Sequence, residues 1–205
     1  MIVGLTGSIA TGKSTVSKIL SDLGAVIVDA DKIVRHVQAK GEAAWRDIVT
    51  AFGEEILLKS GELDRAKLGS IVFSDTAKRE QLNTIVHPRV REERDRQTEA
   101  ALSANPRQVV VWDIPLLIET GIYKDVDKTI VVYVDQETQL RRLLERDKLA
   151  LEQAQKRIAA QMPVEEKKTY ADYLIDNRGT LEETREQVRR AYVELTELAH
   201  RGAEA

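Results

Sequence analysis

The chain has 205 residues, of which 31 are basic and 34 acidic, giving a net charge of −3 at pH 7. This length can bury a full hydrophobic core without a disulfide or a structural metal. The nearly balanced charges leave no broad basic face of the kind that binds nucleic acid. The absence of cysteine excludes a disulfide framework, a thiolate nucleophile and a zinc–cysteine site. We therefore expect one domain with an insertion, in a reducing compartment and without an obligatory protein partner.

The chain opens with an apolar run at residues 2–5, which has the length of a strand. This run has no basic lead-in and continues directly into a glycine-rich motif, so it does not fit a signal peptide. No apolar run approaches the length that crosses a membrane. We expect a cytosolic protein that is not associated with a membrane.

Residues 7–14 read Gly-Ser-Ile-Ala-Thr-Gly-Lys-Ser, which matches the phosphate-binding loop G-x-x-x-x-G-K-[ST] between a strand and a helix. Backbone N–H groups and the start of the helix would hold the phosphates of a nucleotide. Lys13 would reach the β- and γ-phosphates, and the Ser14 hydroxyl would bind Mg²⁺. A plain glycine-rich turn is the alternative. We disfavour it because four fixed residue types coincide with the strand–helix junction.

The next elements alternate between short apolar strands and helical stretches, which predicts an α/β fold with a parallel sheet covered on both faces. The gap of about eighty residues before the third strand exceeds what a crossover helix requires, so it predicts an inserted helical subdomain. A helical stretch rich in Arg and Lys, at residues 140–170, has the position of a mobile lid. The expected strands are 2–5, 25–28, 109–112, 129–134 and 173–175, and the expected helices include 43–52, 77–86, 88–104 and 181–200.

Asp29 and Asp31 directly follow the second expected strand, at the edge of the sheet where ligands of α/β proteins bind. A carboxylate there could accept the proton of an attacking hydroxyl group. We assign this role to Asp31. For Asp29 we prefer capping of the next helix, because Asp is a strong N-cap residue.

Asp113 ends the third expected strand and begins the run Asp-Ile-Pro-Leu-Leu-Ile-Glu, which ends at Glu119. An acidic residue after a buried strand occupies the Walker-B position, where it contributes to a magnesium site. Ser14 and Asp113 are therefore the candidate metal residues. Capping of the next helical turn by Asp113 remains an alternative, and the case for Glu119 is weaker.

Basic residues at two further places are candidates for phosphate or substrate contacts. Arg142 and Arg146 lie four apart on the helix after the fourth strand, so they share one face and could meet the nucleotide. A solvated helix paired through its own acidic residues explains them equally well. His87 and Arg89 flank Pro88, which we expect to separate two helices of the insertion. They could contact a substrate phosphate or ribose, although a lone His is more often structural.

The class of nucleotide-binding protein follows from the other motifs. The chain has no Asn-Lys-x-Asp motif, which GTPases use to read guanine, and it is short for a motor or transporter ATPase. A small-molecule kinase fits better, and a long insertion argues for a large acceptor. Two alternatives stay open: a kinase of another nucleotide or small-molecule acceptor, and a nucleotide-dependent regulatory switch.

The ordered set of motifs resembles the dephospho-coenzyme A (dephospho-CoA) kinase family, whose members are P-loop kinases related to the nucleoside monophosphate kinases. The likeness covers nearly the whole chain. It rests on Leu5 to Thr15, Asp29-Ala30-Asp31, His87-Pro88, residues 113–119, residues 139–147 and Ile175-Asp176-Asn177.

The resemblance implies a P-loop NTPase three-layer sandwich with a five-stranded parallel sheet in the order 2-3-1-4-5. It places the nucleotide-binding core at residues 1–32, 107–140 and 171–205. It places an acceptor domain at residues 33–106 and a lid at residues 141–170. The implied reaction, the final step of coenzyme A biosynthesis, transfers a phosphoryl group from ATP to the ribose 3′-hydroxyl of dephospho-CoA.

The resemblance also implies roles for single residues. Ala10, Thr11, Gly12, Lys13, Ser14 and Thr15 would hold the ATP phosphates. Asp31 resembles the base, and His87 belongs to the acceptor site. Arg142 resembles a residue that covers adenine, Arg146 one that contacts phosphate, and Asn177 one near the nucleotide. Ala10 stands where family members often have Gly, and we expect Ala to be tolerated there if φ stays negative.

Overall fold

A computed structural model describes residues 1–202 of the chain, so the last three residues of the expected nucleotide-binding core lie outside the description. The described chain contains a five-stranded sheet in the order β2-β3-β1-β4-β5, in which β1 pairs with β3 and β4, and β4 with β5, all in parallel. The strands are β1 (Ile2–Gly7), β2 (Val26–Asp29), β3 (Val110–Asp113), β4 (Lys128–Tyr133) and β5 (Tyr173–Asp176). The expected fold class and strand order are therefore confirmed.

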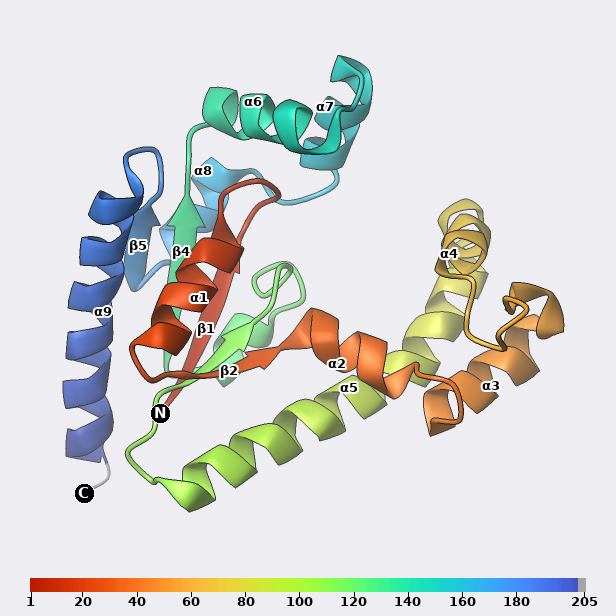
Figure 1. The fold of residues 1–205 in the computed structure, drawn as a ribbon, viewed down its shortest axis with the longest axis horizontal. Helices are drawn as coiled ribbons and strands as arrows, with labels where there is room; N and C mark the ends of the chain where they lie inside the picture. The colour runs from red at the N-terminus through yellow and green to blue at the C-terminus, as the bar shows by residue number, and fades with distance from the viewer. Residues whose placement is uncertain (203–205) are drawn as a thin grey trace. The chain divides into compact units, whose positions relative to one another are not determined.

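The central strands are buried on both faces, as their nearly continuous apolar sequences predict. The register pairs Val3 with Val111 and Leu5 with Ile130, so alternate side chains of neighbouring strands lie on the same face. That face packs against helices α1 (Lys13–Asp22) and α9 (Leu181–Gly202), which run alongside the sheet in Figure 1. The phosphate loop thus leads from a buried central strand into a helix that is packed on the same sheet.

Helix α9 begins where the turn after β5 predicts. Thr180 and Glu183 form a capping box: the backbone N–H of Thr180 donates to Glu183 Oε2 at 2.7 Å, and the backbone N–H of Glu183 donates to Thr180 Oγ1 at 3.2 Å. The backbone N–H and the hydroxyl of Thr180 both donate to the Glu183 carboxylate and hold its pKa below the usual value. This cap fixes the helix start close to the end of β5.

Further helices of the sheet-containing part follow β4. They are α6 (Gln136–Asp147), α7 (Leu151–Ala159), α8 (Val164–Lys167) and a 3₁₀ helix at Lys168–Tyr170, whereas another 3₁₀ helix, Ile122–Asp125, precedes β4. In Figure 1, α6 and α7 lie beyond the tip of the β4 arrow. Asp135 caps α6, because its Oδ1 accepts the backbone N–H of Thr138 at 2.8 Å.

The chain divides into two compact units, Met1–Val28 with Ala100–Ala205 and Asp29–Glu99. The second unit is helical and has its own apolar core, formed around Ile48, Phe52 and Val86. Its elements are α2 (Ala30–Val37), α3 (Ala43–Phe52), the short turn Glu54–Ile56, α4 (Arg65–Ser74) and most of α5 (Thr76–Ala104).

The expected helix break at Pro88 is wrong, because α5 is a single helix of 29 residues that contains Pro88 in its interior. Proline removes one backbone donor and crowds the preceding turn. The carbonyl that loses its helical donor is that of Thr84, and the next carbonyl, that of Ile85, accepts from Arg89 Nη1 at 2.6 Å. Val86 and its apolar neighbours also pack into the core of this unit, so tertiary packing holds the helix together.

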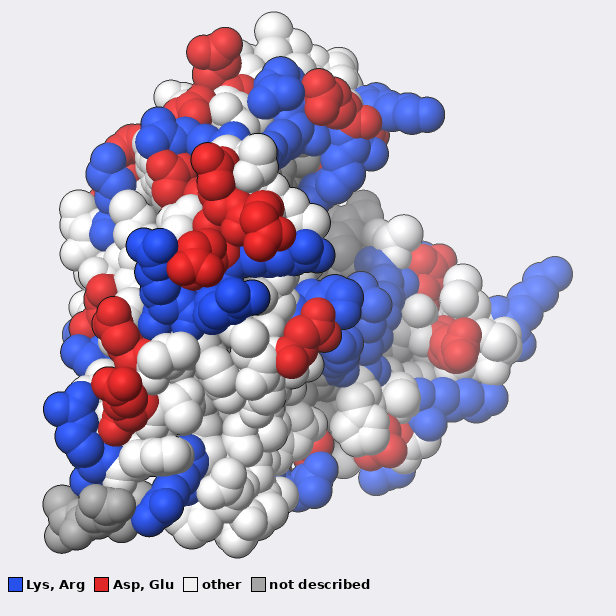
Figure 2. All heavy atoms as spheres, turned by 60° about the vertical axis from the view of Figure 1, so that its left-hand side comes forward, with Lys and Arg blue, Asp and Glu red and all other residues white. Residues whose placement is uncertain are grey.

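The surface carries both signs of charge. In Figure 2, blue Lys and Arg side chains lie beside red Asp and Glu, and much of the lower part of this face is uncharged. Among the described residues, no helix is both long and apolar enough to cross a bilayer.

Candidate active site

The phosphate loop joins β1 to α1 through an unusual backbone. Gly12 has φ 88° and serves as the N-cap of α1, a conformation that costs glycine little. Ala10 also has a positive φ, 63°. The condition of a negative φ at Ala10 is therefore not met, and the loop places an L-residue in the left-handed region at an energetic cost of about 1–2 kcal/mol.

Lys13 and Asp113 form an ion pair between the phosphate loop and the end of β3. The paired strands β1 and β3 bring their carboxyl ends to the same edge of the sheet, so this contact follows from the topology. Asp113 is only 5% exposed, and Lys13 is half-buried. Burial of Asp113 beside a cation explains its place after an apolar strand better than helix capping does.

The oxygen atoms of Ser14 and Asp113 suit a small, hard cation such as Mg²⁺. The described residues contain no cluster of three or more His, Cys, Asp or Glu side chains able to hold a metal. A hydroxyl and one carboxylate fit a cation whose remaining ligands are phosphate oxygens and water, which is how Mg²⁺ is bound with nucleotides.

Asn177 follows β5 and supports the phosphate loop from the side. Its Nδ2 donates to the carbonyl of Thr11 at 2.7 Å, and its Oδ1 accepts from Thr184 Oγ1 at 2.8 Å. Thr184 is fully buried on α9. A Cβ on Gly12 would lie 2.1 Å from Asn177 Nδ2, so glycine is also required by this close approach. The Asn177 side chain therefore connects the phosphate loop to α9 through both of its polar atoms.

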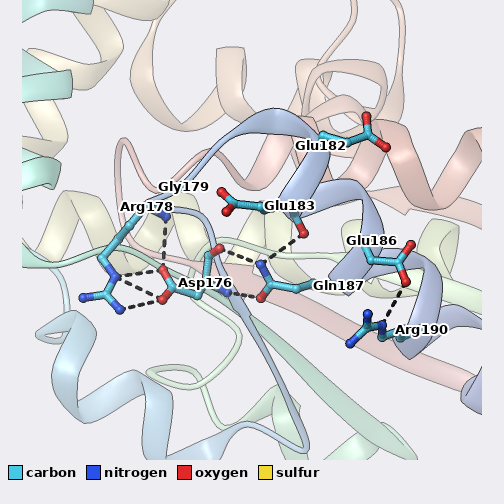
Figure 3. Close-up of a pocket in the computed structure, with 8 residues that line it drawn as sticks. All are labelled: Asp176, Arg178, Gly179, Glu182, Glu183, Glu186, Gln187 and Arg190. Atoms are coloured by element: carbon cyan, nitrogen blue, oxygen red, sulfur yellow. Dashed lines mark hydrogen bonds and ion pairs between the residues drawn. The ribbon is translucent and has the colours of Figure 1, made fainter.

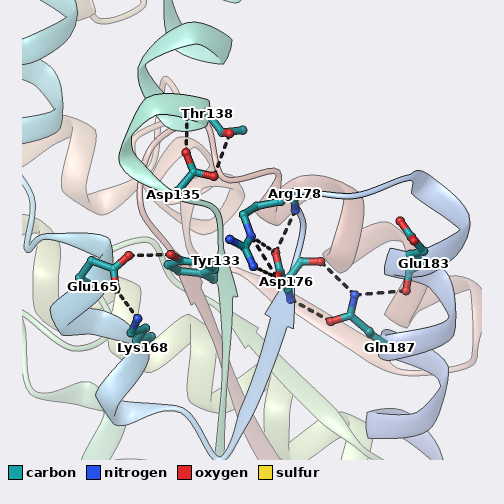
Figure 4. Close-up of polar contacts among 9 residues, drawn as sticks. All are labelled: Tyr133, Asp135, Thr138, Glu165, Lys168, Asp176, Arg178, Glu183 and Gln187. Carbon is teal, nitrogen blue, oxygen red and sulfur yellow. Dashed lines mark hydrogen bonds and ion pairs between the residues drawn. The ribbon is translucent and has the colours of Figure 1, made fainter.

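A polar network surrounds Tyr133 at the end of β4 (Figure 4). The Tyr133 hydroxyl donates to Glu165 Oε1 at 2.6 Å, which raises the pKa of Tyr133. Lys168 pairs with Glu165 and, with Tyr133, lowers the pKa of that carboxyl. Lys168 and Arg178 also lie 5.2 Å and 5.5 Å from the centre of the Tyr133 ring, within cation–π range. The network links the segments before and after β5.

A pocket of about 800 Å³ lies beside this network, at the start of α9 (Figure 3). Its two arginines are engaged by carboxylates: Arg178 by Asp176 at 2.6 Å, and Arg190 by Glu186 at 2.9 Å. The pocket is therefore not a ready phosphate site. Its lining residues are Asp176, Arg178, Gly179, Glu182, Glu183, Glu186, Gln187 and Arg190.

The two candidate arginines of α6 have different surroundings. Arg146 donates through Nε to Asp147 Oδ1 at 2.7 Å, and Arg157 pairs with the same carboxylate at 2.9 Å. Arg146 thereby holds the pKa of Asp147 below its usual value. Arg142 is half-buried, and within residues 1–202 no ion pair engages it. Arg142 is thus the more available cation of the two.

The remaining candidates belong to the helical unit. Asp29 caps α2, because its Oδ1 accepts the backbone N–H of Lys32 at 3.0 Å, which confirms the preferred interpretation. Asp31 lies exposed in the first turn of α2, and His87 is exposed on α5. Arg89 pairs with Asp47, so it is not a free cation.

Sequence reasoning missed Gln139, Gln161 and Lys167. Gln139 is 2% exposed and Lys167 is fully buried, and each forms a contact with a distant segment. Polar residues in helices and turns are ordinarily exposed, so no local pattern marks these as buried.

A sequence model described as dephospho-CoA kinase matches residues 1–183. The chain is 51% identical over 188 residues to a dephospho-CoA kinase of Geobacillus kaustophilus, with 92% of this chain and 93% of that protein covered. It is 50% identical over 200 residues to one of Shouchella clausii, with coverage of 98% and 100%. The solved dephospho-CoA kinase from Campylobacter jejuni has a TM-score of 0.73 and 32% identity, with coverage of 96% and 97%. The chain therefore belongs to the dephospho-CoA kinase family.

Proposed function

We propose that this chain transfers the γ-phosphoryl group of ATP to the ribose 3′-hydroxyl of dephospho-CoA, giving coenzyme A and ADP. The 3′-oxygen forms a bond to the γ-phosphorus, the bond from that phosphorus to the β–γ bridging oxygen breaks, and the hydroxyl proton passes to a carboxylate. The observation that carries this proposal is the contact of Lys13 with Asp113 at one edge of the sheet, in a chain of this family.

On the nucleotide side, we assign the ATP phosphates to the backbone of residues 10–15 and to the Lys13 ammonium group. Lys13 would exchange part of its contact with Asp113 for the β- and γ-phosphates. We assign Arg142 to adenine and Arg146 to phosphate, where guanidinium donors stabilise the charge of the transferring group. Asn177 lies near the nucleotide in this scheme, and its bond to Thr11 supports a role through the loop.

We propose that Mg²⁺ is held by Ser14 and Asp113 together with phosphate oxygens and water. The ion would neutralise charge that develops on the phosphates. Both residues present oxygen atoms, and Asp113 already lies beside the phosphate loop.

On the acceptor side, we assign the base to Asp31, and contacts with dephospho-CoA to His87 and Arg89. Asp31 and His87 are exposed, and a group that receives a substrate must be accessible. In this scheme residues 33–106 form the acceptor domain, residues 141–170 the lid, and residues 1–32, 107–140 and 171–205 the nucleotide-binding core. The reaction would take place in the cytosol, which agrees with a chain without cysteine.

The test is ADP formation with Mg²⁺-ATP and a panel of acceptors: dephospho-CoA, AMP, CMP, shikimate and gluconate, with products identified by mass. We expect phosphorylated product from dephospho-CoA alone, and loss of turnover in EDTA that Mg²⁺ reverses. Turnover of another acceptor instead would make the chain a different small-molecule kinase. Partner binding with only slow hydrolysis and no phosphorylated acceptor would make it a regulatory switch.

A further inference from the structure

The residue before Ala10 is held at both of its backbone polar groups. The Ile9 N–H donates to Gln161 Oε1 at 2.7 Å, and the Ile9 carbonyl accepts from Gln139 Nε2 at 2.8 Å. The two glutamines lie 152 and 130 residues away in the chain. One belongs to α6 and the other to the turn after α7, so neither contact arises from the local fold of the loop.

The two bonds fix the backbone that enters Ala10. The Ile9 carbonyl belongs to the peptide group between Ile9 and Ala10, and rotation of that group changes φ of Ala10. Ala10 has φ 63°, which L-residues avoid. The bond from Gln139 therefore opposes the rotation that would return Ala10 to a common conformation. It keeps the backbone N–H groups after Ala10 in the arrangement that the loop requires.

The turn that carries Gln161 is itself fixed to the sheet. The Met162 N–H donates to Glu119 Oε1 at 3.2 Å, and Glu119 pairs with the buried Lys167 at 3.0 Å. Lys167 Nζ also donates to the carbonyl of Pro115 at 3.0 Å, which accepts from Thr6 Oγ1 at 2.9 Å. The turn that carries Gln161 is thus connected through these contacts to Thr6 on β1, the strand that leads into the phosphate loop.

We propose that Gln139 and Gln161 are positioning residues for ATP, which hold Ile9 and so maintain Ala10 in its left-handed conformation. They act through the loop backbone and do not touch the reacting atoms. The proposal rests on the proposed function only for the identity of the nucleotide. It gives Glu119 a role, since that carboxylate holds the turn of Gln161.

The first test is the affinity for Mg²⁺-ATP, measured by calorimetry, together with KM and kcat. Gln139→Ala and Gln161→Ala should each weaken ATP binding about tenfold, equal to about 1.4 kcal/mol. KM for dephospho-CoA should stay within about twofold, because the acceptor does not contact Ile9 in this scheme. Gln155→Ala is the matched control: Gln155 lies on α7 and, like Gln139 and Gln161, lines a cavity of about 900 Å³, but none of the hydrogen bonds described for residues 1–202 joins it to the loop.

A second test separates positioning from general destabilisation. Ala10→Gly, combined with Gln139→Ala, should restore most of the lost ATP affinity, because glycine adopts a positive φ without the penalty of alanine. The ATP affinity of Ala10→Gly alone is the reference against which this rescue is measured. A merely structural role of Gln139 would give no such rescue.

A third test uses the direction of each hydrogen bond. Gln161 accepts, so a carboxylate in Gln161→Glu can still receive the Ile9 N–H, whereas Gln139→Glu places an acceptor against the Ile9 carbonyl. Both variants add the same charge near the phosphates. We expect Gln139→Glu to bind ATP about tenfold more weakly than Gln161→Glu, equal to about 1.4 kcal/mol.

Normal ATP affinity in both alanine variants would overturn the proposal. Equal losses for ATP and dephospho-CoA without rescue by Ala10→Gly would also overturn it. If the wild-type chain binds ATP but does not phosphorylate dephospho-CoA, the proposed function fails, and the calorimetric comparison still decides the role of the glutamines.

Discussion

The candidate residues fall into a nucleotide half in the sheet-containing unit and an acceptor half in the helical unit, and the two halves are held in different ways. Around the phosphate loop, candidate residues are held by contacts from distant parts of the chain, such as Lys13 by Asp113 and the Thr11 carbonyl by Asn177. In the helical unit, Asp31 and His87 are exposed, and their side chains take part in none of the hydrogen bonds or ion pairs described for residues 1–202.

This difference suggests that the nucleotide side is organised before its ligand binds. A preformed site loses less ordering entropy on binding. The acceptor candidates are surface side chains whose roles depend on the presence of an acceptor. Variants of the two halves should therefore fail in different kinetic parameters.

The largest effect should come from Lys13→Ala. We expect kcat/KM to fall about 10³-fold, because no other described cation contacts this part of the loop and charge stabilisation is lost at the transferring group. Steady-state kinetics measures the loss. Lys18→Ala is the control, since Lys18 lies on the same helix but pairs at the surface with Asp22. A Lys13→Ala variant with near-normal kcat would contradict the role of the loop.

Asp31→Asn tests the acceptor half. We expect kcat to fall about 10²-fold while ATP affinity stays nearly constant, because the substitution removes a base and keeps the shape. Asp29→Asn should have little effect, since Asn caps a helix about as well as Asp. If Asp31→Asn instead loses ATP affinity, Asp31 belongs with the metal site and the two halves are less separate than proposed.

Thr184→Val probes the distant support of the loop. It removes the donor to Asn177 Oδ1 and leaves that oxygen without its partner. We expect about 1–2 kcal/mol less stability, measured by urea unfolding, and an ATP affinity about threefold weaker. Thr196→Val is the control on the same helix, because Thr196 donates to the carbonyl of Tyr192 within α9. Equal ATP affinities of Thr184→Val and Thr196→Val would show that the support of Asn177 does not affect nucleotide binding.

The smallest effect should come from Glu93→Gln in the helical unit. Hydrogen bonds from Arg96 and Gln97 lower the pKa of Glu93 from 4.5 to about 2. A lowered pKa stabilises the fold above pH 4.5, and this contribution is lost as the pH falls toward 2. We expect Glu93→Gln to cost about 0.5–1 kcal/mol at pH 7, since Arg96 is largely exposed. The difference in urea midpoint between the wild type and Glu93→Gln should be smaller at pH 3 than at pH 7, with ATP affinity unchanged. A larger difference at pH 3 would contradict this assignment.

Local sequence determined much of this protein. Alternating apolar runs predicted all five strands to within two residues at each end, and the spacing of Gly7, Gly12 and Lys13 identified the phosphate loop. These signals suffice because burial of a parallel strand and the shape of a tight loop are imposed on consecutive residues. The strand order came from the family resemblance, since periodicity does not state which strands are neighbours.

Tertiary structure alone decided the rest. It carried α5 through Pro88, gave Ala10 a positive φ, and buried Gln139 and Lys167 against distant backbone groups. Each outcome opposes a local preference: proline disfavours a helix interior, alanine avoids a positive φ, and long polar side chains favour solvent. At the phosphate loop, two contacts that span more than a hundred residues hold the backbone of Ile9 and so oppose the preference of Ala10 for a negative φ. A local sequence pattern does not indicate such contacts.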